Sequence, residues 1–372
     1  MELPGQSGYA RHRTCILPIL LSVAVMFLVK VGLDGMQHGA SMRSTFVQME
    51  PPANCKVNHP CEYQGVVDFR VIVMTYNRNE SLEKCLRSLE KVDTLVDTMR
   101  VEIWIDRSGR GEVDNGTVKV AESFRQRWTK PHLGHTCAIH IREKNAGITG
   151  QWTDTWRPKL DSKEIGLLLE DDIDVSPMAY RWLKAVHAKY DDRDDVSGYT
   201  IQMQNFRFHG SSKPATKVVP KSDSVFMYSI LGTWGFSPHP KSWRNFQDWV
   251  HDARDNNKIE PIVPGLDQLN RWYGRFKRHQ SMWEMWHIYF SYINKLYCIH
   301  PNLKAYTGMD NVMLAFNRQE KGLHYKGTNV LATDAAKLLS HWDASLVKFP
   351  ERTIQFAYNG TIHGLLSSSE YS

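Results

Sequence analysis

The chain has 372 residues, of which 42% are hydrophobic, so it can build one large domain or two small ones around a sizeable core. Its formal net charge is only +6 and its acids and bases are interspersed, which argues against a nucleic-acid-binding protein. Twelve tryptophans are a high count; aromatic side chains often line carbohydrate or nucleotide clefts, although most belong to cores.

The amino-terminal part has the pattern of a membrane-targeting segment. Residues 1–15 are polar and basic, and residues 16–33 are apolar except for Lys30. That length spans a thin bilayer when flanking residues help, and the positive charge keeps the amino end cytoplasmic. The alternative is a cleaved signal peptide, but no clear small-x-small cleavage site follows. We expect a cytoplasmic tail (1–15) and a signal-anchor transmembrane helix (16–33), which gives a single-pass type II protein with a lumenal domain.

Residues 34–65 are predicted to form a stem or linker, because they are rich in Gly, Ser, Pro and Asn and show no periodicity. Cys55 and Cys61 lie there and would pair in an oxidising compartment. Glycosylation sequons agree with a lumenal address, although such triplets arise easily by chance. They occur at Asn79, Asn115 and Asn359.

The folded domain is expected between residues 66 and 344, and its first half alternates strands with helices. Strands are predicted at 69–76, 101–105 and 137–141, and helices at 81–89 with Ser81 as cap, at 118–128 and around Trp152 and Trp156. This alternation predicts an α/β fold with a mostly parallel sheet and helices on both faces. Three apolar cysteines fit no zinc motif and are predicted to be buried thiols: Cys85, Cys137 and Cys298.

One apolar strand ends in consecutive carboxylates. The run from Ile165 to Leu169 leads into Glu170, Asp171 and Asp172, followed by Asp174 and by Ser176 and Pro177, which can begin a helix. Adjacent carboxylates repel one another and stay ionised together only with a cation among them or with free access to water. The pattern therefore predicts a divalent-metal site at the carboxyl edge of the sheet, with a solvated acidic turn as the alternative.

Two other predicted strands also end in polar residues. Thr75, Tyr76 and Arg78 follow the first strand, and Asp106 ends the second. A nucleotide lies at this edge in open α/β sheets, where a carboxylate accepts from a base or ribose. Ordinary turn chemistry is the alternative for each feature alone. Neither a P-loop nor a GxGxxG motif is present.

In this order, the segments VIVMTYNR, WIDRSG, KNAGITGQW and GLLLEDDIDVSP resemble GT-A nucleotide-sugar glycosyltransferases. The EDD triplet resembles the DxD-type motif of that fold. EDDIDVSPMAY is similar to the N-acetylglucosaminyltransferase I group, and KNAGITG is nearer to the family 2 style. The resemblance covers residues 66–325, and an anchored lumenal domain also resembles the layout of Golgi transferases.

The resemblance implies roles for individual residues of the donor site. Thr75, Tyr76 and Arg78 would border the base, and Asp106 would bind the base or its ribose. Gly147 would let the backbone pass close to the nucleotide. The three acidic residues would contact the sugar part of the donor and the metal. Asp171 would face the ribose or sugar, Glu170 would contact the donor sugar, and Asp172 would bind Mn²⁺ or Mg²⁺. The diphosphate of a UDP-sugar would complete the metal's shell.

The second half carries fewer signals. The aspartates of 191–195 are predicted to form a solvated loop, with a strand at 199–203 and a helix at 241–250. The Gly-Thr-Trp-Gly segment resembles the acceptor side of these transferases, where Trp234 would stack on a sugar; a core tryptophan is the alternative.

Glu284 begins an aromatic-rich helix, and its position resembles that of the catalytic base in inverting GT-A enzymes. The N-acetylglucosaminyltransferase I group has paired aspartates there, whereas this chain has Glu284 and Met285. Asp267 and Asp310 are the reserve candidates, and a helix-start glutamate stabilised by the dipole is the structural alternative. His324, followed by a basic residue, is a candidate for closing over the diphosphate, and residues 345–372 are expected to form a tail of marginal order.

Together these features predict a metal-dependent, inverting hexosyl- or N-acetylhexosaminyltransferase of the Golgi or secretory-pathway membrane. It would transfer a sugar, with GlcNAc as one candidate, from a UDP-sugar to a hydroxyl of a glycan or glycoconjugate. One alternative is a nucleotidyltransferase or phosphodiesterase, which would need more carboxylates or histidines around a second metal. The other is a non-catalytic lumenal carbohydrate- or nucleotide-sugar-binding protein on a degenerate GT-A scaffold.

Overall fold

The computed structural model describes residues 60–363, apart from 64, 161, 204–218, 257, 277–281, 304–311 and 321–337. The predicted anchor at 16–33 and most of the predicted stem lie outside these residues. In the part of the chain that is described, no helix has the length and apolar character needed to cross a membrane.

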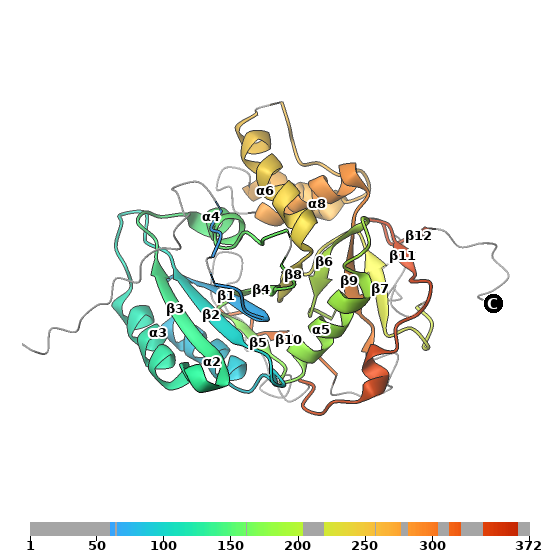
Figure 1. The fold of residues 1–372 in the computed structure, drawn as a ribbon. Helices are drawn as coiled ribbons and strands as arrows, with labels where there is room; N and C mark the ends of the chain where they lie inside the picture. The colour runs from blue at the N-terminus through green and yellow to red at the C-terminus, as the bar shows by residue number, and fades with distance from the viewer. Residues whose placement is uncertain are drawn as a thin grey trace, which may run out of the picture. The chain divides into compact units, whose positions relative to one another are not determined.

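A ten-stranded sheet organises the described residues, with the order β12-β11-β7-β9-β6-β8-β4-β1-β2-β3 (Figure 1). Its strands are β1 (Phe69–Thr75), β2 (Met99–Ile105), β3 (His135–Ile141), β4 (Ile165–Glu170), β6 (Val196–Thr200), β7 (Val225–Tyr228), β8 (Phe236–Pro238), β9 (Tyr297–Pro301), β11 (Gln355–Phe356) and β12 (Ile362–His363). A separate two-stranded sheet pairs β5 (Ile173–Val175) with β10 (Ala315–Asn317).

The strand directions bring several strand ends to one edge. Strands β3, β2, β1 and β4 are parallel neighbours. Because β8 runs antiparallel to both β4 and β6, β6 points the same way as β4, and β9 is parallel to β6. The carboxyl ends of these strands therefore meet at one side of the sheet, called the carboxyl edge below. The predicted α/β class with a mostly parallel sheet is confirmed, and the antiparallel strands make the sheet a mixed one.

Strand β1 is buried along its whole length because each of its faces meets a separate core. Val71 and Val73 belong to one core, and Ile72 and Met74 to the other. Helices lie on both faces, as predicted (Figure 1). On the first are α2 (Asn79–Leu89), α3 (Asn115–Trp128) and α5 (Ala179–Tyr190), and on the second α4 (Gly147–Asp154), α6 (Pro240–Asp255) and α8 (Trp283–Asn294).

Two predicted helix starts need correction. Helix α2 begins at Asn79 without a side-chain cap, so Ser81 lies inside it and donates to the Asp171 carbonyl oxygen instead. Helix α5 begins at Ala179, because the Ser176 hydroxyl accepts from Met178 N and donates to a distant carbonyl. In both places the serine hydroxyl that the local pattern predicted to cap a helix donates a hydrogen bond to a residue distant in the sequence.

The packed domain extends beyond both predicted boundaries. At the amino end, Tyr63 is buried and its hydroxyl donates to Thr155 O at 2.7 Å, and Cys61 is buried and disulfide-bonded. Its predicted partner, Cys55, lies outside the described residues. At the carboxyl end the predicted tail contains β11 and β12, and Phe356 is fully buried. These short strands pair with distant partners, so no local periodicity reveals them. Cys85, Cys137 and Cys298 are buried free thiols, as predicted.

Candidate functional site

The acidic triplet lies at the carboxyl end of β4, in the interior of the sheet. Glu170 is in register with Met74 of β1, so the turn that follows lies beside Thr75 and the start of α2. Asp171 and Asp172 are only 1% and 3% exposed. A solvated acidic turn, the alternative drawn from the sequence, would expose them, so the burial favours a built site.

Asp171 has two firm partners. Its Oδ2 accepts from the Thr75 hydroxyl at 2.6 Å, and its Oδ1 accepts from the Arg78 guanidinium. Burial nevertheless raises the pKa of Asp171 to about 6, against the opposing effect of Arg78. Thr75 and Arg78 thus hold the Asp171 carboxylate; that they also border a base, as the resemblance implied, stays a prediction.

Asp172 has one carboxylate oxygen that accepts a hydrogen bond and one that does not. Its Oδ2 accepts from Arg78 at 3.3 Å, but its Oδ1 is buried and receives no hydrogen bond from the part of the chain that the structure describes. Burial raises the pKa of Asp172 despite the nearby guanidinium. A buried carboxylate oxygen without a donor is costly unless a ligand completes it.

Glu170 connects the triplet to the other face of the sheet. Its Oε1 accepts from Trp152 Nε1 at 3.1 Å, and burial, together with the charge of Asp172, raises its pKa to about 8. The Trp152 indole stacks on Trp283 with ring centroids 4.2 Å apart. The two packed rings connect Glu170 to the start of α8, where Glu284 is the residue after Trp283.

The donor set fits a hard cation that takes few ligands from the protein. Among the described residues, no group of three or more His, Cys, Asp or Glu side chains is arranged to hold a metal ion. Both oxygens of Asp171 and Oε1 of Glu170 accept hydrogen bonds, whereas the buried Oδ1 of Asp172 receives none from the described residues and is the best placed to bind a metal. Mg²⁺-type ions commonly bind one or two carboxylates and complete their shell with water and phosphate oxygens.

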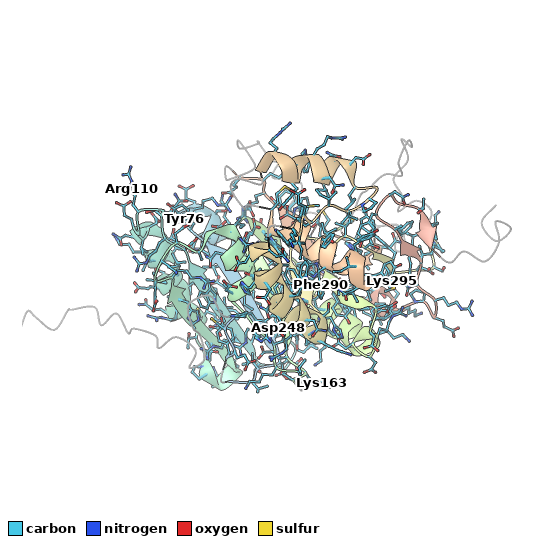
Figure 2. The ribbon with its side chains drawn as sticks, turned by 90° about the horizontal axis from the view of Figure 1, so that it is seen from above. Tyr76, Arg110, Lys163, Asp248, Phe290 and Lys295 are labelled. Atoms are coloured by element: carbon cyan, nitrogen blue, oxygen red, sulfur yellow. The ribbon has the colours of Figure 1, made fainter. Side chains whose placement is uncertain are left out.

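Asp106 shapes the neighbouring loop. Its carboxylate accepts from the backbone N–H of Arg107 and Ala146, both at 2.8 Å, and of Gly147 at 2.9 Å. Gly147 has φ +63°, and a Cβ there would meet no protein atom within 4 Å. The glycine is therefore required by its backbone angle, and the space above it is open. Tyr76 is 40% exposed and lies towards the same side of the molecule as Arg110 (Figure 2).

The Gly-Thr-Trp-Gly segment reaches the carboxyl edge because β8 runs backwards. Leu168 is paired with Phe236 in antiparallel register, so Glu170 and Trp234, two residues away on each strand, belong to the same edge. Gly235 has φ +84°, and a Cβ there would come within 2.4 Å of Ile201. The segment thus lies at the same edge of the sheet as the triplet, and its acceptor-side role stays a prediction.

Glu284 lies in the first turn of α8, where burial raises its pKa to about 7. Asp267 is the first residue of α7 (Asp267–Phe276), and its side chain is exposed. Asp310 and His324 lie outside the described residues. The loop at 191–195 was predicted to be solvated. Only part of it is, because Asp191 accepts hydrogen bonds from His187 and Tyr199.

The residue that sequence reasoning missed is Arg318, whose guanidinium donates to the Asp171 carbonyl oxygen at 2.7 Å. It lies 147 residues from Asp171, and no local motif marks it. The sequence gives one indication that a basic residue lies here: Asp174 is a carboxylate next to the triplet, and it requires a positively charged partner if it is buried.

Neither a protein family nor a curated protein sequence matches the chain. Solved structures show distant similarity. S. aureus TarS is 14% identical, with a TM-score of 0.36, over 63% of this chain and 60% of that one. The mannosyltransferase PcManGT from Pyrobaculum calidifontis, in complex with GDP-Man and Mn²⁺, is 13% identical, with a TM-score of 0.30, over 50% of this chain and 47% of that one. The glycosyltransferase GlyE of Streptococcus pneumoniae is 10% identical, with a TM-score of 0.31, over 78% and 67%. The chain thus spans less than two thirds of the first two structures, and at these scores the similarity carries no weight for its function.

Proposed function

We propose that the chain is a metal-dependent, inverting glycosyltransferase. It transfers a sugar, with GlcNAc as one candidate, from a UDP-sugar to a hydroxyl of a glycan or glycoconjugate. We also propose that it acts in the secretory pathway, most simply as a Golgi type II membrane protein, as the apolar stretch at 16–33 suggests.

One observation carries the proposal: the buried Oδ1 of Asp172, to which no described residue donates, lies in an acidic triplet at the carboxyl edge of a mostly parallel sheet. Nucleotide ligands bind at this edge in open α/β sheets. The oxygen suits a hard cation whose other ligands come from a diphosphate.

The residues around the triplet have distinct tasks in this mechanism. Asp172 would hold Mn²⁺ or Mg²⁺, which supplies charge neutralisation for the departing nucleoside diphosphate. Arg78 orients both aspartates, and Glu170 lies on the side where the donor sugar is expected. Asp106 fixes the loop of Gly147, beside which the nucleoside would lie.

Glu284 acts as the general base. Its carboxylate takes the proton of the acceptor hydroxyl while that oxygen forms a bond to the anomeric carbon. The bond between the anomeric carbon and the diphosphate oxygen breaks, and its electron pair leaves with the nucleoside diphosphate. A single displacement of this kind inverts the anomeric centre. A base with a pKa near 7, as burial gives Glu284, is well matched to neutral conditions.

The test is release of UDP from a panel of UDP-sugars by the full-length protein, with Mn²⁺ and with chelator. We expect one donor to be consumed only with the metal, and Asp172→Ala to abolish the reaction. The matched control is Asp192→Ala, because Asp192 is exposed in a turn outside the triplet. If the folded protein binds none of the donors, the transferase proposal fails.

A different result would favour the second candidate, a non-catalytic binding protein. This chain lacks the paired acids of the N-acetylglucosaminyltransferase I group at 284–285, which keeps that candidate open. Tight binding of one UDP-sugar without turnover, over a panel of glycan acceptors, would establish it.

A further inference from the structure

Arg318 is a buried cation directly behind the acidic triplet. It follows β10, whose residues pair with β5 in antiparallel register, Phe316 opposite Asp174. The residue is only 9% exposed. Burying a guanidinium costs free energy unless its N–H groups are satisfied, so its partners indicate what it does.

Those partners are the backbone and side chains that hold the acidic turn. Nη2 donates to the Asp171 carbonyl oxygen at 2.7 Å and to the Ser81 carbonyl oxygen at 2.8 Å. Nη1 donates to the Asp174 carboxylate, and Nε donates to Glu320 at 2.7 Å. The backbone N–H of Arg318 donates to the Asp172 carbonyl oxygen at 3.0 Å.

The contacts therefore fix two consecutive carbonyl groups, those of Asp171 and Asp172. The hydroxyl of Ser81 also donates to the Asp171 carbonyl oxygen, at 3.0 Å, and accepts from Arg318. A carbonyl held by two donors cannot rotate its peptide plane without breaking both bonds. Since the backbone sets the direction of each Cα–Cβ bond, this network fixes the points from which the two carboxylates extend.

We propose that Arg318 is a positioning residue, which locks the Asp171–Asp172 turn so that Asp172 presents its free oxygen to a metal–nucleotide ligand. The role rests on the proposed transferase function. The planar fork of the guanidinium is essential to it, because it serves carbonyl and carboxylate acceptors in several directions at once. A lysine ammonium keeps the charge but cannot reach all of them.

The test compares Arg318→Lys with wild type in the full-length purified protein. One measurement is the affinity for Mn²⁺ in the presence of UDP, followed by the electron paramagnetic resonance of free Mn²⁺. We expect the dissociation constant to rise about tenfold or more, while the dissociation constant for UDP alone changes less than twofold. The matched control is Arg193→Lys, because Arg193 also makes a two-pronged contact, to Asp195, in a surface turn.

The second measurement is amide hydrogen exchange without any ligand. We expect peptides that cover residues 170–176 to exchange at least tenfold faster in Arg318→Lys, with β1–β3 unchanged, and Arg193→Lys to match wild type. Should Arg318→Lys not fold, Asp174→Asn removes one anchor of the guanidinium and is expected to shift both measurements in the same direction.

The outcomes separate the two claims. Unchanged exchange and unchanged Mn²⁺ affinity in a folded Arg318→Lys protein would overturn the positioning role. A second outcome is faster exchange of the turn in Arg318→Lys together with no binding of Mn²⁺ and UDP by the wild-type protein. It would support the contact that locks the turn and would contradict the transferase function. Faster exchange throughout the domain would mean that Arg318 only stabilises the fold, and would also overturn the proposal.

Discussion

Three neighbouring carboxylates at the end of β4 have three different sets of partners. An indole N–H engages one oxygen of Glu170, a hydroxyl and a guanidinium engage both oxygens of Asp171, and none of the described residues donates to the buried Oδ1 of Asp172. Their surroundings therefore differ although their side chains are nearly identical. The metal role proposed for Asp172 rests on this difference.

Glu284 gives a prediction on the pH dependence of the rate. A general base works when ionised, and burial places the pKa of Glu284 at about 7. We expect kcat/KM to fall about tenfold per pH unit below that pKa. Steady-state rates between pH 5.5 and 8.5 measure this directly.

The Glu284→Gln variant complements that profile. We expect its kcat to fall by about 10²–10⁴-fold, with donor affinity unchanged, because the amide cannot take a proton. A variant that keeps wild-type turnover would exclude Glu284 as the base and redirect attention to other carboxylates.

At the scale of elements, the segment 60–63 is part of the domain because Tyr63 satisfies buried groups on two sides. Its hydroxyl donates to Thr155 O and accepts from Trp104 Nε1 at 2.8 Å, and its ring packs 4.4 Å from the Arg70 guanidinium. Arg70 itself is buried and paired with Glu102 and Glu164. The segment thus covers an ionic cluster on the sheet.

Removing that hydroxyl should weaken the fold. We expect Tyr63→Phe to lower the free energy of unfolding by about 1–3 kcal/mol, since Trp104 Nε1 loses its acceptor in a buried place. Urea denaturation followed by tryptophan fluorescence gives the value. Tyr292→Phe, at a 39% exposed tyrosine, is the control and should change it little. Equal effects in the two variants would show that the buried contacts of Tyr63 contribute nothing.

The elements also show what the sequence can and cannot predict. Strand β1 was predicted because its apolar run is continuous, and the position of the triplet followed from the same pattern in β4. The reversed strand β8 and the terminal strands β11 and β12 are too short to leave a periodic signal. The roles of Arg78 and Arg318 depend on contacts 94 and 147 residues distant, which no local pattern encodes.

At the scale of the whole molecule, buried histidines set how stability responds to acid. His287 is 1% exposed and is surrounded by Phe236, Trp243, Phe246 and Trp283. Among the described residues, neither of its ring nitrogens has a hydrogen-bond partner. Burial lowers its pKa to about 3. Between about pH 6.5 and pH 3, the His287 imidazole is protonated in the unfolded chain but neutral in the folded one. His287 therefore lowers the free energy of unfolding as the pH falls through this range.

Carboxyl groups with raised pKa values, such as Glu170, have the opposite effect on the pH dependence of stability. The quantity to compare is therefore the difference in free energy of unfolding between variant and wild type. We expect His287→Phe to gain relative stability on acidification, by about 2 kcal/mol between pH 7 and pH 5. Denaturation at both pH values measures it, with His132→Phe as the exposed control. A difference that does not vary with pH would mean that His287 takes up a proton equally in the folded and the unfolded protein, and would contradict the prediction.

The pairing of β5 with β10 also has a consequence for the order of assembly. As the chain is synthesised, Asp171 leaves the ribosome 147 residues before Arg318 does, and Asp172 follows it directly. Strands β1 to β4 are synthesised early, but the turn after β4 lacks the guanidinium of Arg318 until that residue has been synthesised. Contacts so distant along the chain close slowly, because loop entropy must be overcome first. The active turn is thus a late product of folding, and a nascent chain stopped before residue 318 would have the acidic triplet without the contact that orients it.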